Sequence, residues 1–237
     1  MTQPDGRSSS ALSRRQYLAA FGAAGAVSAA GCLGDVFGGG DAAVVLDEPS
    51  DELDSDHLPY PTHGESFPDF ELPDPIAGET ISTDSETLAD QTLIVTGFYA
   101  FCPAECLLLI GSMAETQRVV VNDGYADDVT FLPITFDPER DTPEELDDYA
   151  DEMNVDRDAG NWRFLRPEDE AEARAVVDEK LAINYEQDDG AGDTYEFIHN
   201  TLTYLVNPDR YVERVYRDDD LPVETLADEA MTVADAY

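Results

Sequence analysis

Apolar and polar residues alternate in blocks along the chain from residue 92 onward. The segments Thr92–Ala100 and Val129–Phe136 are rich in β-branched and aromatic residues, which is typical of buried strands. Pro133 predicts that the second of these strands is interrupted or lies at a sheet edge. Shorter runs of the same kind predict further strands at Trp162–Leu165, Thr201–Val206 and Tyr211–Tyr216.

The apolar positions between these strands follow the spacing of helices. We expect helices over residues 107–121, 142–153, 167–181 and 223–234. The second of them starts with Thr142, Pro143 and Glu145, which supply an N-cap, a first-turn proline and a capping-box glutamate. The acidic, glycine-containing segment 186–195 predicts a mobile loop. The order βαβαβαββα predicts an α/β fold, with a central mixed sheet and helices on both faces.

Charge is the most unusual property of the composition. The chain has 53 acidic and 13 basic residues, which gives a formal net charge of −40. This excess excludes nucleic acid as a partner. Because the carboxylates are spread over nearly every segment, they favour the solvated coat of a salt-adapted protein, as in a halophilic archaeon, over a surface made for one cationic partner.

The first 31 residues have the features of an export signal. Arg14 and Arg15 form a twin-arginine start, and a small, apolar stretch too short to span a bilayer follows them. This stretch ends at Gly31-Cys32, as in a lipobox, whose cysteine carries the lipid. An uncleaved anchor and a buried helix are the alternatives. We expect a protein exported in the folded state and anchored through Cys32 to the extracytoplasmic face of the cell membrane.

Residues 32–64 predict a flexible acidic tether. They are rich in Gly, Asp, Glu, Ser and Pro and have no sustained hydrophobic period. We expect His57 and His63, which lie in this segment, to be solvated. The folded domain is then expected over residues 65–237, a length that can bury a sizeable core.

Cys102 and Cys106 lie between a predicted strand and a predicted helix, and they are the only cysteines of the predicted domain. On one helical turn their Cβ atoms would lie about 5–6 Å apart. A tight disulfide needs about 3.5–4.5 Å, so this spacing favours a bridging ion or reversible redox chemistry over a structural disulfide. Unpaired N–H groups at a helix start also favour the thiolate form.

His199 is the only histidine of the predicted domain, and the predicted sheet brings it to the same edge as the cysteine segment. Two thiolates and one imidazole form a soft donor set of low coordination number. Such a set favours copper, whereas a structural zinc ion would need a fourth ligand, for example an aspartate.

At these residues the chain resembles the Sco/SenC family. The run Cys102-Pro103-Ala104-Glu105-Cys106 is similar to that family's Cys-Pro-x-x-Cys motif, and residues 136–146 nearly repeat its Val-Asp-Pro-Glu-Arg-Asp-Thr-Pro segment. His199 precedes an apolar strand that ends in Asn-Pro-Asp, as the family's copper-binding histidine precedes a strand that ends in Asp-Pro-Asp-Gly. The chain departs from the family pattern at Leu107, Ile198 and Arg210, where the family often has proline, aspartate and glycine.

The resemblance implies a thioredoxin-like fold in which Cys102, Cys106 and His199 bind copper. It also implies delivery of copper to the binuclear centre of cytochrome c oxidase subunit II or a similar copper protein. The alternative is a thiol–disulfide oxidoreductase, with Cys102 and Cys106 as the redox pair that keeps the cysteines of that centre reduced. No proline precedes Thr201 as it does in thioredoxin-type reductases, which favours metal binding. A thiol peroxidase fits the cysteine spacing poorly. Asp137 is expected to act in a turn or a helix cap.

Overall fold

The computed structural model describes residues 44–49, 58–190 and 195–237. The chain divides into two units, Met1–Gly39 and Gly40–Tyr237, and all described residues belong to the second unit. The predicted export signal, Cys32 and His57 lie outside the described residues.

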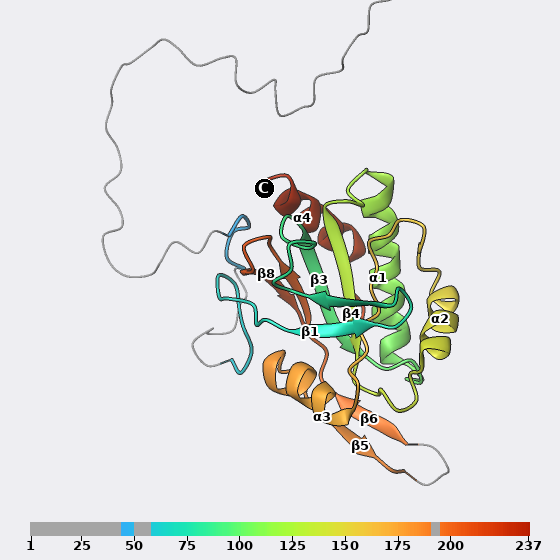
Figure 1. The fold of residues 1–237 in the computed structure, drawn as a ribbon. Helices are drawn as coiled ribbons and strands as arrows, with labels where there is room; N and C mark the ends of the chain where they lie inside the picture. The colour runs from blue at the N-terminus through green and yellow to red at the C-terminus, as the bar shows by residue number, and fades with distance from the viewer. Residues whose placement is uncertain (1–43, 50–57, 191–194) are drawn as a thin grey trace, which may run out of the picture. The chain divides into compact units, whose positions relative to one another are not determined.

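A four-stranded mixed sheet forms the centre of this unit (Figure 1). The strand order is β4-β3-β7-β8, with β3 parallel to β4 and antiparallel to β7. Every side chain of β3 and β4 is buried, as expected for parallel strands that are covered on both faces. The four strands are β3 (Thr92–Phe98), β4 (Val129–Thr135), β7 (Thr203–Val206) and β8 (Val212–Tyr216).

The effect predicted for Pro133 is confirmed. β4 is the edge strand of the four-stranded sheet, and within the described residues only isolated bridges to Trp162 and Leu165 lie beyond it. The N–H groups of Phe131 and Thr135 donate outward to the carbonyls of residues 161 and 165. Pro133 lies between these two donors and has no N–H group, so the ladder is interrupted and the strand predicted at 162–165 does not form.

Helices cover both faces of the sheet. α1 (Glu105–Asn122) and α4 (Val223–Ala234) pack against each other on one face. On the other face α3 (Glu170–Ala173) continues into the π-helical segment η3 (Arg174–Lys180). α2 (Pro143–Glu152) has the predicted N-cap, because the Thr142 side chain accepts a hydrogen bond from the Glu145 N–H. No helix in the described part of the chain has the length and apolar character needed to cross a membrane.

Two hairpins add to the elements expected from the sequence. β1 (Glu71–Asp74) pairs with β2 (Glu79–Ser82), and β5 (Tyr185–Asp188) pairs with β6 (Glu196–His199), each pair antiparallel. The prediction of a loop over residues 186–195 is therefore wrong at its start, because residues 186–188 belong to β5, whereas β6 begins directly after its last residue. His199 is the last residue of β6 and does not directly precede the strand β7.

Parts of the expected tether contact the folded unit. The backbone N–H groups of Val45 and Leu46 donate to the buried carboxylate of Glu213 at 2.9–3.0 Å. Gly64 donates its N–H to the Val212 carbonyl. His63 is not simply solvated, because its Nε2 lies 2.9 Å from the Leu46 carbonyl. The contacts of the folded unit therefore begin before residue 65.

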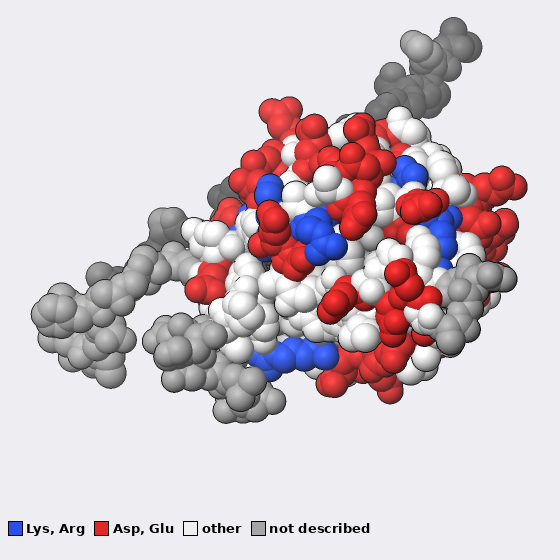
Figure 2. Space-filling model, turned by 90° about the horizontal axis from the view of Figure 1, so that it is seen from below, with Lys and Arg blue, Asp and Glu red and all other residues white. Residues whose placement is uncertain are grey.

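Carboxylates cover much of the surface. Figure 2 shows clusters of Asp and Glu side chains across the face viewed, with uncharged residues between them and fewer Lys and Arg side chains. Charge of one sign spread in this way keeps a protein hydrated and soluble.

Candidate metal centre

Cys102 and Cys106 lie where β3 leads into α1. The helix begins at Glu105, so Cys106 stands in its first turn while Cys102 lies in the preceding loop. The expectation that both cysteines share a helical turn is therefore wrong for Cys102. The physical reason is Pro103, because the residue before a proline is disfavoured in the helical conformation.

The helix start stabilises a thiolate at Cys102. Its Sγ accepts a hydrogen bond from the Cys106 N–H at 3.3 Å, one of the N–H groups that have no partner within the helix. The pKa of Cys102 is lowered by the hydrogen bond from the Cys106 thiol, against the effect of burial, and also by hydrogen bonds from His199 and the backbone. The pKa of Cys106 is raised by that same bond to Cys102 and by burial. The directions of the two pKa shifts make Cys102 the sulfur that ionises first.

His199 reaches the two thiols from the hairpin β5–β6. Its Nε2 lies 3.8 Å from the Cys106 Sγ, and its Nδ1 lies 3.1 Å from the Asn200 carbonyl. A carbonyl only accepts hydrogen bonds, so Nδ1 carries a proton and donates it to Asn200. Burial lowers the pKa of His199, but its hydrogen bonds to Cys102 and Asn200 raise that pKa above its ordinary value. Without a metal ion Nε2 therefore also holds a proton toward the Cys102 sulfur, and Nε2 becomes the ligand atom when that proton leaves. The carbonyl thus orients the imidazole, although Ile198 replaces the acidic residue of the family pattern.

Aromatic rings surround the imidazole. Tyr99 meets the His199 ring edge-on at 6.0 Å, and Phe136 lies 5.3 Å from it, both measured between ring centroids. Phe197, on the same face of β6 as His199, packs against both rings, and its N–H donates to the Tyr99 hydroxyl at 3.4 Å. We did not identify these residues from the sequence. The available signal was the spacing of Tyr195, Phe197 and His199, three rings at every second position.

Arg140 links the loop after β4 to the same hairpin. Its Nε pairs with the Asp137 carboxylate, and its Nη1 donates to the Tyr195 carbonyl at 2.7 Å. The guanidinium carbon lies 3.7 Å from the centroid of the Tyr195 ring and 5.2 Å from that of Phe101. Tyr195 also donates its hydroxyl to Asp137 at 2.8 Å. The backbone carbonyl of Asp137 accepts a hydrogen bond from the Asp141 N–H, which is the expected turn role. The side-chain carboxylate of Asp137 binds both Arg140 and Tyr195 and so anchors the link between the loop and the hairpin.

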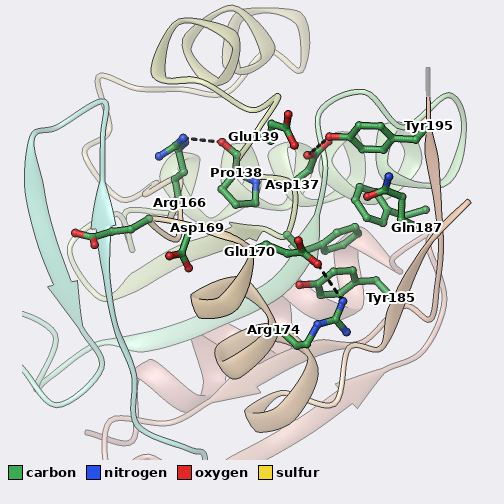
Figure 3. A pocket seen from close by; sticks show the side chains of 13 residues that line it. Asp137, Pro138, Glu139, Arg166, Asp169, Glu170, Arg174, Tyr185, Gln187 and Tyr195 are labelled. Atoms are coloured by element: carbon green, nitrogen blue, oxygen red, sulfur yellow. Dashed lines mark hydrogen bonds and ion pairs between the residues drawn. The ribbon is translucent and has the colours of Figure 1, made fainter. Parts of the chain in front are cut away.

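A cavity of about 350 Å³ lies beside this link (Figure 3). Its walls include Phe136 and Phe197, whose rings also contact His199. Figure 3 shows Tyr195 pointing to Asp137 and Arg174 pairing with Glu170. Neither cysteine lines the cavity, so it is separate from the thiols. Its remaining charged lining residues are Glu139, Arg166, Glu168 and Asp169.

The structure brings together the three residues that the sequence singled out. The ligand atoms of Cys102, Cys106 and His199 all lie within 4.8 Å of one another. Both cysteines are free and buried. Within the described residues, no fourth His, Cys, Asp or Glu belongs to this group. Two sulfurs and one nitrogen fit a soft cation of low coordination number better than a structural zinc ion, which takes four ligands.

Comparison with known proteins gives a consistent result. The family model described as SCO1/SenC matches residues 63–234. An SCO2-like protein of Rickettsia felis is 28% identical over 153 residues, which are 63% of this chain and 69% of that protein.

Two solved structures show the same fold. Bradyrhizobium japonicum ScoI with copper bound has a TM-score of 0.59 at 22% identity, covering 71% of this chain and 99% of that chain. BsSco, a Sco-family cytochrome c oxidase assembly protein with a disulfide switch, has a TM-score of 0.59 at 20% identity, covering 74% and 96%. The α/β, thioredoxin-like fold predicted from the sequence is confirmed.

Proposed function

The chain belongs to the SCO1/SenC family, and we propose that it binds copper outside the cytoplasm and delivers it to the binuclear copper centre of cytochrome c oxidase. The observation that carries this proposal is the group of two thiols and one imidazole within 4.8 Å. The relatives support it, since one was solved with copper and another is described as an oxidase assembly protein. The client would be oxidase subunit II or a similar copper protein.

The three ligands differ in ways that suit the uptake and release of copper. Cys102 has the lowered pKa, so it is the sulfur that binds first as the thiolate. Cys106 releases its thiol proton to solvent when it binds, because a thiol ligates as the thiolate. His199 adds a neutral ligand from a separate hairpin. Delivery then proceeds by ligand exchange, in which client ligands replace the ligands of this chain one at a time.

Copper titration tests the binding step. The full-length chain with Cys32→Ser, kept reduced, should bind one copper ion and retain it against a competing chelator. Cys102→Ser and Cys106→Ser should abolish stoichiometric binding, and His199→Ala should weaken it. His63→Ala is the matched control and should leave binding unchanged. A wild-type chain that binds no stoichiometric copper but rapidly reduces a disulfide would contradict the proposal.

The unequal pKa values of the two thiols suit a second function, thiol–disulfide exchange. The Cys102 thiolate would attack a client disulfide and form a mixed disulfide, and Cys106 would resolve it. The client would gain two thiols, and this chain would be left with a Cys102–Cys106 disulfide that an external dithiol must reduce. This function needs no third ligand, so the position of His199 supports copper binding more strongly.

For location, we propose export by the twin-arginine route and a lipid on Cys32 that anchors the chain to the extracytoplasmic face of the membrane. The support is the sequence of residues 1–32. Cys32→Ala should release the protein from membranes on fractionation, whereas continued tight attachment would indicate an uncleaved anchor.

A further inference from the structure

Exposed apolar side chains gather beside the proposed copper ligands. Among the described residues, six large hydrophobic side chains are exposed, and four of them lie within two positions of a ligand. These four are Phe101, Leu107, Leu108 and Ile198, and the other two are Ile76 and Tyr237. Leu107 and Ile198 are also positions at which the chain departs from the family motif, and at Ile198 an apolar side chain replaces an acidic one.

Leu107 and Leu108 begin an uncharged face of α1. No charged residue occurs between Glu105 and Glu115, although several side chains in this half of the helix reach the surface. Apart from Pro143, the exposed positions of α2 carry acidic residues instead. An uncharged, solvent-facing helix surface is therefore exceptional in a chain with a net charge of −40, and exposed apolar patches mark interaction sites.

This face borders a groove. An open depression of about 580 Å³ runs between α1 and the end of α2. At the end of the depression nearest to Cys106, the residues that line it are apolar or have small side chains. That part of the lining consists of Leu107, Leu108, Gly111, Ser112, Ala114 and Met153. The remainder is lined by Asn154 and by the charged residues Glu115, Arg118 and Glu152. Leu107 follows Cys106 directly, so the apolar end of the groove adjoins the metal centre.

We propose that this groove, defined by Leu107, Leu108, Gly111, Ala114 and Met153, is where the copper-exchange partner docks. The proposal rests on the proposed function. Ligand exchange requires the partner's ligand atoms to come within bonding distance of the same ion, roughly 2.3 Å for a thiolate. The partner surface around those atoms must then cover the residues next to Cys106.

The charges around the groove define its occupant. The matching surface is an uncharged apolar segment of the copper-binding partner protein, followed by a basic residue that faces Glu152, since Glu115 already pairs with Arg118. Salt screens the negative charge of this chain over about 3 Å at 1 M ionic strength, while apolar contacts persist in salt. An apolar docking surface therefore recognises its partner at salt concentrations that suppress charge steering.

Ile198 lies outside this surface. Side chains alternate across a strand, and His199 on β6 faces the thiols and the rings of Tyr99 and Phe136. Ile198 therefore points to the opposite face of the hairpin, which makes it a useful comparison residue.

The test measures the binding of the copper-loaded, full-length Cys32→Ser chain to the soluble copper domain of oxidase subunit II. Combining Leu107→Ser with Leu108→Ser should weaken binding about tenfold, the scale expected for two central apolar contacts. Ile76→Ser is the matched control, an exposed isoleucine away from the site, and should leave binding unchanged. Copper affinity should be the same in all three proteins, which keeps this test separate from that of the proposed function.

Two further measurements decide between surfaces. A photo-reactive residue at position 112 should cross-link to the subunit II domain, and one at position 76 should not. If the double leucine variant binds as tightly as the wild type while Ile198→Ser weakens binding, docking occurs on the hairpin and the groove proposal is wrong. If all variants bind the domain equally and still hold copper, the groove proposal also fails, but copper binding stands. Loss of copper binding in the unsubstituted chain would instead contradict the proposed function.

Discussion

Asp141 is a buried carboxylate beneath the cysteine loop. It accepts hydrogen bonds from the Ala100 N–H at 3.1 Å and from the Thr135 hydroxyl. Burial raises its pKa to about 7 although both hydrogen bonds act in the other direction. In the unfolded chain an aspartate loses its proton near pH 3.9. Between about pH 4 and pH 7 the folded state therefore holds a proton that the unfolded state has released, so the stability contributed by this group falls as the pH rises.

Asp141→Asn should remove this pH dependence. The free energy of unfolding of the wild type, minus that of the variant, should decrease by up to roughly a few kcal/mol from pH 4 to pH 7 and stay level above pH 7. Urea unfolding of both proteins across this range measures the difference. A difference that does not change with pH would show that Asp141 titrates alike in both states.

Sequence could identify the residues whose chemistry is distinctive. The sequence places two thiols beside a strand–helix junction and one imidazole in the domain, and these three groups can be recognised as a soft donor set before the structure is known. Arg140 and Tyr99 have no such signature, because their roles arise from contacts with the hairpin that carries His199. Those contacts join segments that lie far apart in the sequence, and no local pattern encodes them.

The hairpin β5–β6 positions the third ligand, and Arg140 connects it to the loop after β4. Arg140→Ala removes the pairing with Asp137, the hydrogen bond to the Tyr195 carbonyl and the cation–π contacts of the guanidinium with the Tyr195 and Phe101 rings. Copper affinity should fall about five- to thirtyfold, which corresponds to roughly 1–2 kcal/mol for a partly buried cation–π contact. Chelator competition measures this loss.

Two comparisons separate this effect from general destabilisation. Arg157→Ala, which removes surface ion pairs of α2, should leave copper affinity unchanged. Combining Arg140→Ala with His199→Ala should weaken binding little more than His199→Ala does, because Arg140 acts through the imidazole. Additive losses would contradict this link.

Two glycines test the packing of β3 and α1. A Cβ atom at Gly97 would lie 3.1 Å from methyl groups of Val177 and Ile183, whereas one at Gly111 would meet no atom within 4 Å. Gly97→Ala should lower the free energy of unfolding by roughly 1–3 kcal/mol through overpacking. Gly111→Ala should raise it by about 1 kcal/mol, because alanine is the better helix former. Urea unfolding measures both, and an equal effect of the two changes would contradict the packing of η3 on β3.

Long elements with a clear hydrophobic period could be predicted, and so could the short but apolar strands β7 and β8, whereas the short strands with polar exposed positions could not. β3, β4, α1, α2 and α4 all form close to their expected ranges. β5 and β6 have only four residues each, and their exposed positions are largely acidic, so the alternation was too brief to distinguish from a loop. The π-helical turn of η3 follows from local packing and leaves no periodic signal.

For the whole molecule, the acidic coat predicts a dependence of stability on salt. A net charge of −40 places many carboxylates near one another (Figure 2), and their repulsion disfavours the compact state. Raising KCl from about 0.2 M to 3 M shortens the Debye length to below about 3 Å and should raise the thermal unfolding midpoint. Differential scanning calorimetry checks this, and a midpoint that falls with salt would contradict it.

The central claim is that Cys102, Cys106 and His199 hold a copper ion that passes to the oxidase. The most direct test mixes the copper-loaded, full-length Cys32→Ser chain with the copper-free subunit II domain and then separates the two proteins. We predict that copper leaves with the subunit II domain and that Cys102 and Cys106 remain as free thiols. If copper stays on this chain while the domain gains two thiols and Cys102 and Cys106 form a disulfide, the chain delivers electrons and the account is wrong.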